Sequence, residues 1–391
     1  MTNESKQLLS ILKSCLFRSQ YQLPEKLDWS DIYQEATSHT VVGLLIPYVK
    51  RFSDEHSIPN IEQWFKTGDQ LLAYFVNCFQ AQIELVNLFE ESSIPILIVK
   101  GYAAAVNYPN PQLRTIGDID FLIPKNRFEE GITLLEKYGY VKRYGDCYKS
   151  RHIVFTKNYI VLEMHRSMSS FGLDIDSIID LGFEQFDYGM IAGISFPMLP
   201  PLENGLVLLT HIRQHLLEED YSLGLRQIID WAMYVNRYCG TIVEGNLWDQ
   251  EFMAIACQLG LDTLTITLTY ICREWLGLQN FPDWCERADH KTATELVELV
   301  MACGNFGSKL EHGNKSIKQG FILYRHDGIF KRLQMQGLNN WKAAQKHVFL
   351  RHFAWLFQLF RNIILIFSSK NIIYQLNAGK KKSELISRLR I

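Results

Sequence analysis

The order of apolar and polar positions divides the chain into a helical beginning, a strand-rich middle and a helical end. In the first ninety residues apolar side chains recur every three or four positions, which is the spacing of one helix face. This spacing predicts helices over 5–17, 31–50 and 61–91. The last of these alternates large aromatic and aliphatic side chains, as helices that pack into a core do.

Apolar runs of a different kind begin after Ser92. Residues 94–99 form a short β-branched run that predicts a buried strand, and residues 116–123 predict a second one. Between and after them, the alanine-rich stretch 102–108 and the amphipathic stretch 127–138 predict helices. The alternation of strand and helix favours a sheet with helices packed against it.

Two further strand-like runs, 153–156 and 160–165, are separated by only three residues and predict a hairpin. The order strand, helix, strand, helix, hairpin is typical of an α+β protein. The sequence therefore predicts a small mixed β-sheet core flanked by N-terminal and C-terminal helical regions.

Helical periodicity returns after Pro200-Pro201. It predicts helices over 202–219, 223–238, 247–259, 263–276 and 292–302. We expect four regions: an N-terminal helical region at 1–91, the α+β core at 92–200, a helical domain closing the cleft at 201–310, and a helical and basic tail at 311–391.

Composition narrows the class of protein. The 391 residues are 47% hydrophobic and 21% charged, which is ordinary for a soluble globular protein of two or three packed units. A net charge of −2 argues against a general binder of long nucleic acids, which carries a basic footprint. The eight cysteines form no CxxC pair, and no apolar segment of a signal peptide follows the polar N-terminus. These features predict reduced thiols in a cytoplasmic protein.

The apolar run at 348–376 complicates the soluble interpretation. Arg351, Arg361 and Lys370 interrupt it before it reaches the ~18–20 apolar residues of a membrane span. Residues 379–391 then hold five basic side chains against one acidic. Two interpretations stay open: a helix packed across the domain with a solvated tail, and peripheral contact of this basic tail with the inner face of a membrane.

Three carboxylates on short apolar strands indicate the chemistry. Asp118 and Asp120 are two residues apart, so on a strand both leave one face while Ile119 and Phe121 point into the core. Glu163, on a neighbouring strand, would complete a pocket for a hard divalent cation. Oxygen ligands favour Mg²⁺, and Mg²⁺ in turn favours phosphate substrates. The carboxylates therefore predict metal-dependent chemistry on a nucleoside triphosphate.

The segment VKGYAAAVNYPNPQLRTIGDIDFLI (99–123), followed by a helix and by IVLEMHR (160–166), resembles the DNA polymerase beta-like nucleotidyltransferase superfamily. More narrowly, it is similar to the bacterial group described as uncharacterised nucleotidyltransferases, with Lys-Gly at the end of the first strand and Glu-x-His at the third carboxylate. The resemblance covers about residues 92–170 and extends more weakly through the helices that follow.

The resemblance implies a mechanism with two Mg²⁺ ions. Asp118 and Asp120 would bind both ions, and Glu163 would help to hold the catalytic one and orient the acceptor hydroxyl, or act as its base. Such ions stabilise the attacking and leaving oxygens of an in-line displacement at the α-phosphate. The implied reaction moves an NMP, most readily AMP from ATP, to a hydroxyl of a small molecule or protein and releases pyrophosphate.

The loop after the first strand departs from the superfamily pattern. Members usually carry Gly-Gly or Gly-Ser there, whereas this chain has Lys100-Gly101-Tyr102. Gly101 still allows close backbone approach to a phosphate, and Lys100 offers a positive charge in place of the hydroxyl. Instead of binding phosphate, Lys100 could be a solvated residue at the end of the strand or could form an ion pair with Asp118. Arg114 suits phosphate by its fork geometry, and a structural pair with a carboxylate at a sheet end is the equal alternative.

Histidines accompany the carboxylates. His165 shares a strand face with Glu163 and is expected to brace it by a hydrogen bond or to contact substrate. His152 begins the hairpin, where a capping role is the simpler interpretation.

Two more polar groups lie on the helices beyond residue 200. His211 and His215 have a spacing that can bind zinc, but the metalloprotease pattern needs a Glu where Ile212 stands, so we expect them to face the cleft or the core. Asp230 lies among apolar residues and is expected to be buried and paired, with Arg226 one turn earlier as a candidate partner.

Two other functions stay open at this point. One is a non-catalytic nucleotide-binding or interaction module whose triphosphate loop is degenerate. The other is a membrane-surface transferase that acts in surface-polymer biosynthesis.

Overall fold

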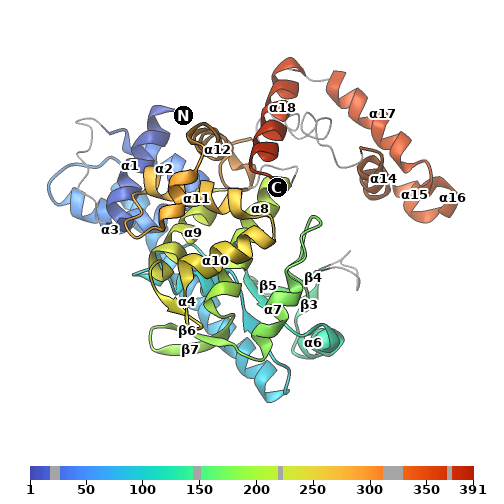
Figure 1. The fold of residues 1–391 in the computed structure, drawn as a ribbon, viewed down its shortest axis with the longest axis horizontal. Coiled ribbons are helices and arrows are strands. Elements are labelled where there is room, and N and C mark those ends of the chain that lie inside the picture. The colour runs from blue at the N-terminus through green and yellow to red at the C-terminus, as the bar shows by residue number, and fades with distance from the viewer. Residues whose placement is uncertain (18–26, 144–150, 219–222, 311–328, 368–371) are drawn as a thin grey trace.

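A computed structural model describes residues 1–17, 27–143, 151–218, 223–310, 329–367 and 372–391. Its centre is a mixed sheet with helices on both faces, and a larger group of helices lies at one end of that sheet (Figure 1). The predicted α+β class, a mixed sheet flanked by helical regions, is confirmed.

The sheet has seven strands in the order β3-β4-β5-β2-β1-β7-β6. Their bounds are β1 Leu97–Ile98, β2 Ile119–Leu122, β3 Val141–Lys142, β4 His152–Lys157, β5 Ile160–His165, β6 Asp187–Ile191 and β7 Ile194–Met198. Strand β2 runs parallel to β5, and β1 runs parallel to β7, while the other neighbours are antiparallel. The predicted hairpin is β4–β5 and is confirmed.

The hairpin β6–β7 has no counterpart among the sequence predictions. It turns at Ala192 and Gly193, whose φ angles of 52° and 80° are left-handed. Within the strands, Gly189 and Pro197 interrupt the β-branched pattern, since glycine and proline are depleted in strands. The local sequence pattern therefore did not predict the two strands that complete this edge of the sheet.

Different helices cover the two faces of the sheet. The long helix α4 (Ile61–Glu91) and α6 (Phe128–Lys137) pack on the face that holds Ile119 and Phe121. The opposite face, which holds Leu122, packs against α7 (Asp176–Ile179) and α8 (Pro201–Leu217). Because side chains alternate along β2, Asp120 emerges on the side of α7 and α8.

The N-terminal helices and those after residue 200 share one hydrophobic core. This core joins α1 (Asn3–Phe17), α2 (Trp29–Ser38) and α3 (Val42–Ser53) to α8, α9 (Leu225–Tyr238), α10 (Trp248–Gln258), α11 (Asp262–Leu276) and α12 (His290–Cys303). The single helix predicted over 31–50 is instead the pair α2 and α3. The chain breaks between them at Thr40, whose φ of 57° ends the first helix.

Short elements connect these parts. They are α5 (Gly101–Ala105), the strands β8 (Ile242–Val243) and β9 (Asn246–Leu247), and the 3₁₀ turns Pro111–Leu113, Lys125–Arg127, Asp180–Phe183, Asp283–Arg287 and Asn305–Leu310. Helix α5 follows β1 directly, so its first turn lies at the end of a central strand.

The last described helices are α14 (Ile329–Asn340), α15 (Lys342–Lys346), α16 (Val348–Arg351), α17 (Ala354–Phe367) and α18 (Ile372–Arg388). Helix α18 contacts α12, whereas α14 to α17 stand apart from the rest of the described chain (Figure 1). None of the helices in the described ranges combines the length and apolar character that crossing a bilayer requires.

Candidate active site

A cleft of about 320 Å³ opens between the sheet and the helices α8 and α9. Its walls come from segments far apart in the chain: the turn from β1 into α5, the strands β2 and β5, and the two helices. The residues predicted from the sequence that line it are Lys100, Gly101, Arg114, Asp118, Asp120, Glu163 and His165. The tertiary structure thus gathers all seven in one place.

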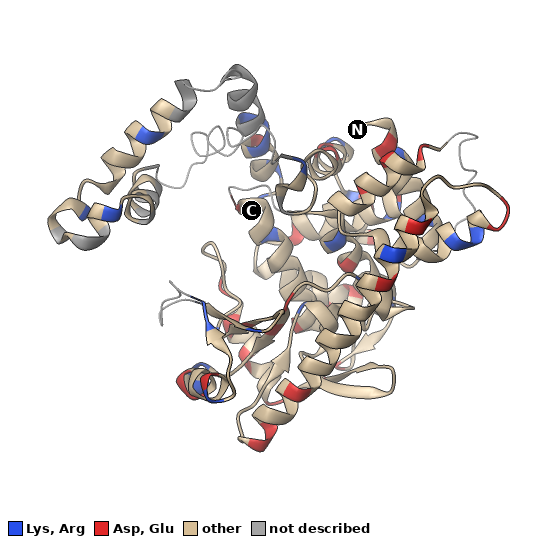
Figure 2. Cartoon of the chain, turned by 180° about the vertical axis from the view of Figure 1, so that it is seen from behind, with Lys and Arg blue, Asp and Glu red and all other residues tan. Residues whose placement is uncertain are grey.

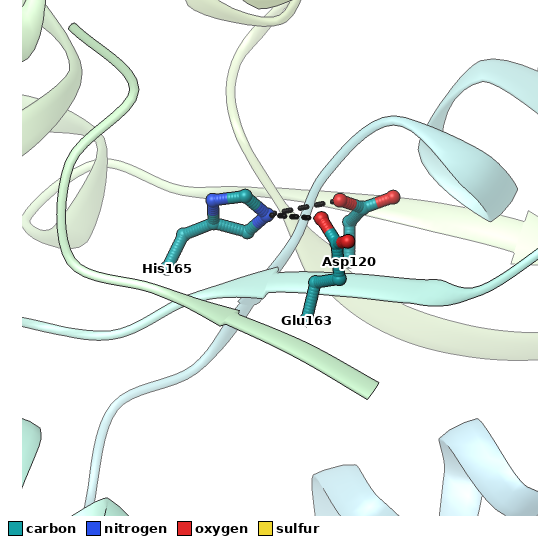
Figure 3. A group of neighbouring side chains, drawn as sticks. All are labelled: Asp120, Glu163 and His165. Carbon is teal, nitrogen blue, oxygen red and sulfur yellow. Dashed lines mark hydrogen bonds and ion pairs between the residues drawn. The ribbon is translucent and has the colours of Figure 1, made fainter. Parts of the chain in front are cut away.

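Asp120 and Glu163 are direct neighbours across the parallel strands β2 and β5. Such neighbours project from the same face, so both carboxylates enter the cleft. His165 lies two residues beyond Glu163, and its Nε2 is 2.9 Å from Asp120 Oδ1 and 3.5 Å from Glu163 Oε2 (Figure 3). One ligand atom from each of the three residues lies within 4.8 Å of the others, an arrangement that a metal ion could occupy.

Asp118 lines the same cleft but precedes the first residue of β2. Repulsion by Asp120, together with burial and the charge of Glu163, raises its pKa to about 7. Burial would also raise the pKa of Asp120, yet Lys100 and His165 outweigh it and hold that pKa well below its usual range. Asp118 is therefore held close to two other carboxylates in a largely buried position. A divalent cation fits such a site.

Lys100 forms an ion pair with one of the cleft carboxylates, Asp120. Its Nζ is 2.7 Å from Asp120 Oδ1 and 3.5 Å from His165 Nε2. Its partner is Asp120, not Asp118 as one of the sequence alternatives had it, because β1 pairs antiparallel with β2 and carries Lys100 toward Asp120. With φ 53° and ψ −125°, Lys100 has a backbone conformation that glycine adopts far more readily. The side chain that pairs with Asp120 is therefore carried by a residue whose own backbone is strained.

Arg114 is engaged in a pair with a carboxylate on α9. Its Nε and one terminal nitrogen lie 2.7 Å from the two oxygens of Asp230, and the Tyr108 hydroxyl donates to the same carboxylate at 2.7 Å. The expectation that Arg226 pairs with Asp230 is corrected here. Arg226 donates instead to the Thr115 carbonyl oxygen at 3.2 Å, and the planar fork of Arg114 fills both carboxylate oxygens.

His211 and His215 both line the cleft, as expected. Their Nε2 atoms are 2.9 Å apart, and His215 Nδ1 lies 3.1 Å from Glu218 Oε2. Burial, with the charges of His215 and Lys100, holds the pKa of His211 well below its usual range, so its ring is neutral. At this distance one of the two rings donates at Nε2 and the other accepts. His152, which the sequence placed at the start of the hairpin, lies next to His165, with their ring centroids 5.1 Å apart and the rings tilted by 43°.

Sequence reasoning did not assign Arg151, Arg226 and Thr210 to the site, although all three line the cleft. Arg226 Nε and Thr210 Oγ1 are buried and have no hydrogen-bond partner among the described residues. Buried polar atoms of this kind are available to a water molecule or to a bound group. No local pattern marks these residues; only the fold brings α8 and α9 against β2.

The chain belongs to the uncharacterised nucleotidyltransferase family, whose model matches residues 25–277, well over half of the chain. It is therefore a transferase of the nucleotidyltransferase type, and the predicted family is confirmed. No curated protein matches the sequence.

Two solved structures are similar over part of the chain. One is ANT(2″)-Ia in complex with adenylyl-2″-tobramycin, at 13% identity and a TM-score of 0.31, covering 46% of this chain and 97% of that one. The other is an antigenic nucleotidyltransferase-like protein from Paracoccidioides brasiliensis, at 13% identity and a TM-score of 0.32, covering 51% and 91%. Because both TM-scores are below 0.5, the family assignment rests on the family model.

Proposed function

We propose that this protein transfers an NMP, most readily AMP from ATP, to a hydroxyl group and releases pyrophosphate in a Mg²⁺-dependent reaction. One observation carries the proposal: a single cleft combines five carboxylates with four cationic side chains, and one of these cations, Arg226, has a buried Nε without a hydrogen-bond partner among the described residues. The carboxylates suit metal ions, and the cations suit the phosphates that such ions accompany.

Asp118, Asp120 and Glu163 are the residues that would hold the metal, as two ions in the proposed reaction. Bound Mg²⁺ would neutralise phosphate charge and stabilise the attacking and leaving oxygens. The raised pKa of Asp118 supports this assignment, because its largest cause is repulsion by Asp120, and like charges that close together favour a bound cation over bare carboxylates.

Lys100, Gly101 and Arg226 would bind the triphosphate. Gly101 begins α5 and lines the cleft, and its absent Cβ leaves room for close approach. Arg226 lies beside Gly117, with its Nη1 3.9 Å from where a Cβ would stand, and its Nε has no hydrogen-bond partner among the described residues. Arg114 would contribute indirectly, because two of its nitrogens hold Asp230 of α9 and the third donates to the Thr115 carbonyl oxygen at 3.3 Å.

The acceptor hydroxyl would lie between Glu163 and helix α8. In the proposed step its oxygen attacks the α-phosphorus, the bond to the pyrophosphate oxygen breaks, and the hydroxyl proton passes to Glu163. The side chain of Glu163 is 24% exposed, more than that of Asp120, so it can be reached from the cleft. Burial would raise the pKa of Glu163, but its contact with His165 and the charge of Lys100 outweigh burial and keep it ionised and ready to accept a proton.

A small molecule or a protein side chain fits this cleft better than a long nucleic acid. The net charge of −2 offers no extended basic surface for a polymer of phosphates. ATP and free thiols at every described cysteine support a cytoplasmic location.

Pyrophosphate release tests the proposal. Purified protein with ATP and Mg²⁺ is incubated with a small-molecule extract, and mass spectrometry searches for molecules that gain an adenylyl group. Glu163→Gln and Asp120→Asn are expected to reduce release by at least about a hundredfold. Glu130→Gln, a surface carboxylate paired with Arg127, is the matched control and should leave release unchanged.

The second candidate is a nucleotide-binding module without transfer chemistry. It is favoured by one observation, the Lys100 ion pair that occupies Asp120 Oδ1. If calorimetry detects Mg²⁺-ATP binding while no pyrophosphate is released with any acceptor, and Glu163→Gln binds as the parent does, this second function replaces the first.

A further inference from the structure

We propose that the C-terminal arm, residues 329–367 with helices α14 to α17, docks on the surface of an anionic membrane. The arm stands apart from the rest of the described chain in both views (Figures 1 and 2). The inference goes beyond nucleotide transfer and does not depend on it, because it rests on residues outside the cleft.

Large apolar side chains cover the outer side of the arm. Phe330, Phe349, Phe353, Phe360, Ile363 and Ile364 are 59, 73, 44, 58, 39 and 66% exposed. Around helix α17, Phe353, Phe360 and Ile364 are separated by seven and four residues, so they form one stripe. A contiguous exposed apolar patch of this kind marks an interaction surface.

The inner side of the arm contains a polar row on α17 beside apolar contacts, which include the buried Leu333 of α14 and the stacked rings of Trp341 and Phe357. Ala354, Gln358 and Asn362, at successive intervals of four, are buried where α17 meets α14. Asn340 Nδ2 donates to Gln358 Oε1 at 3.0 Å, and Gln358 Nε2 donates to Asn362 Oδ1 at 2.9 Å. Polar groups that bond each other inside while apolar groups face outward are typical of helices in contact with lipid.

The two helices approach closely at Gly337. A Cβ on Gly337 would clash with the Ala354 carbonyl oxygen, so a side chain cannot be accommodated there. Small residues at such a crossing allow close backbone contact, as they do in many membrane helix pairs.

Charge identifies the kind of lipid surface. Residues 329–367 contain six basic residues and no acidic one. Residues 329–391 contain twelve basic residues and one acidic, a net of +11, so the preceding 328 residues carry −13 of the total of −2. Figure 2 shows basic positions and no acidic ones on the described part of the arm, whereas both kinds are mixed over the rest of the described chain. A cationic, apolar element fits a negatively charged bilayer, which the acidic remainder of the chain would avoid.

The length of α17 indicates how the arm would lie. Its fourteen residues span about 21 Å, less than the ~30 Å of a hydrocarbon core. Arg361 is exposed in the middle of α17, on a side next to the apolar stripe, where its charge can reach headgroups. Both features favour a helix that lies along the interface. Two arms meeting face to face would bring like charges together, which disfavours a second copy as the occupant.

Flotation with vesicles tests the inference. The full chain is mixed with vesicles of phosphatidylcholine alone, or of phosphatidylcholine with about one third phosphatidylglycerol, at low and high salt. We expect flotation only with the anionic vesicles, weakened by salt. Phe360→Glu combined with Ile364→Glu should reduce the bound fraction at least tenfold.

Two substitutions outside the arm provide the matched control. Tyr159 and Ile242 are 59 and 67% exposed, close to the values of Phe360 and Ile364. Tyr159→Glu combined with Ile242→Glu should float as the parent does. Circular dichroism and pyrophosphate release check that each variant stays folded, since neither pair touches the cleft. Quenching of tryptophan fluorescence by brominated lipid tests the unmodified chain, so the inference does not depend on any variant folding.

Three results would overturn the inference. They are no flotation and no quenching with anionic vesicles, equal loss of flotation in the control variant, or a concentration-dependent dimer that the arm variant abolishes. The last result would assign the apolar stripe to a second copy of the chain.

Discussion

Lys100 and Asp120 form a buried ion pair, with Lys100 Nζ 2.7 Å from Asp120 Oδ1, and Lys100 holds this position in a left-handed backbone conformation. A metal ion held by Asp120, as proposed above, would need the carboxylate that Lys100 occupies. Under that proposal lysine and metal would compete for Asp120, and the lysine would compensate its charge when no metal is bound. Strain of this kind persists only where the surrounding structure holds the residue in place, and it concentrates at functional sites.

Replacing Lys100 should expose this competition. Lys100→Met leaves the buried carboxylates without their cation and is expected to lower the free energy of unfolding by about 3–5 kcal/mol in EDTA. Mg²⁺ should restore part of the loss, because a ligand that binds only the folded state stabilises it. Urea unfolding with EDTA and with Mg²⁺ measures both effects.

Lys125→Met is the control for this experiment. Lys125 pairs with Asp176 and Asp180 at 3.1 Å, but it is 48% exposed, so its loss should lower stability by less than about 1 kcal/mol and without any response to Mg²⁺. A Mg²⁺ response equal to that of the parent in Lys100→Met would contradict competition at Asp120.

Metal affinity should depend on the protonation of Asp118. Its pKa of about 7 means that below pH 7 a proton must leave before the carboxylate can bind a cation. The apparent dissociation constant for Mn²⁺ or Mg²⁺ should therefore rise by about tenfold for each pH unit below 7 and level off above pH 8.

Calorimetry in buffers of different ionisation enthalpy measures the affinity and the protons released. Asp118→Asn should bind the metal more weakly and with less dependence on pH. If metal binding to the parent protein released no proton at pH 6, Asp118 would already be ionised at that pH, and this prediction would be wrong.

The pair of Arg114 with Asp230 should stabilise the fold through its geometry. Either Arg114→Met or Asp230→Leu leaves the other charge buried and unpaired, with an expected loss of about 3–5 kcal/mol. The double variant should recover most of that loss, because both charges are then gone. Chemical denaturation of the four proteins in a double-mutant cycle gives the coupling energy.

The surface pair of Arg127 and Glu130 provides the comparison for that cycle. Its geometry is similar, at 2.7 Å, but Glu130 is 55% exposed. A coupling energy below about 1 kcal/mol is expected there. Equal coupling energies in the two pairs would show that burial does not increase the coupling energy between Arg114 and Asp230.

Stability should fall in mild acid because of His39. This side chain is fully buried between α2 and α3, and burial, with the charge of Lys309, lowers its pKa to about 3. Between pH 6.5 and pH 3 the unfolded chain binds a proton at this histidine that the folded chain does not, so stability decreases as pH falls through that range.

At pH 5 the loss from His39 should be about 2 kcal/mol relative to pH 7.5. Urea unfolding at the two pH values should show a smaller difference for His39→Phe than for the parent. His56→Phe, which changes an exposed histidine, is the control and should keep the parent difference. An unchanged difference in His39→Phe would mean that this residue is not protonated on unfolding.

The sequence predicted correctly those helices and strands that are determined by residues close together in the chain. Helix α4 has the bounds predicted for it, and the hairpin β4–β5 lies where two β-branched runs predicted it, because periodicity and turn length depend only on neighbouring residues. The helix predicted over 31–50 was wrong as one piece, since Thr40 takes a left-handed conformation that no apolar spacing reports. Strands β6 and β7 were missed because Gly189 and Pro197 weaken their pattern.

The site shows the same division. By itself, the sequence determined that Asp120 and Glu163 belong to strands with apolar partners, because a period of two assigns side chains to faces. Only the tertiary structure decided which charges meet: Lys100 with Asp120, and Arg114 with Asp230 across 116 positions. It also brought Arg226, which donates to the Thr115 carbonyl oxygen, into the same cleft as the carboxylates. These partners depend on how β1, β2 and α9 pack, and long-range packing leaves no periodic trace in the chain.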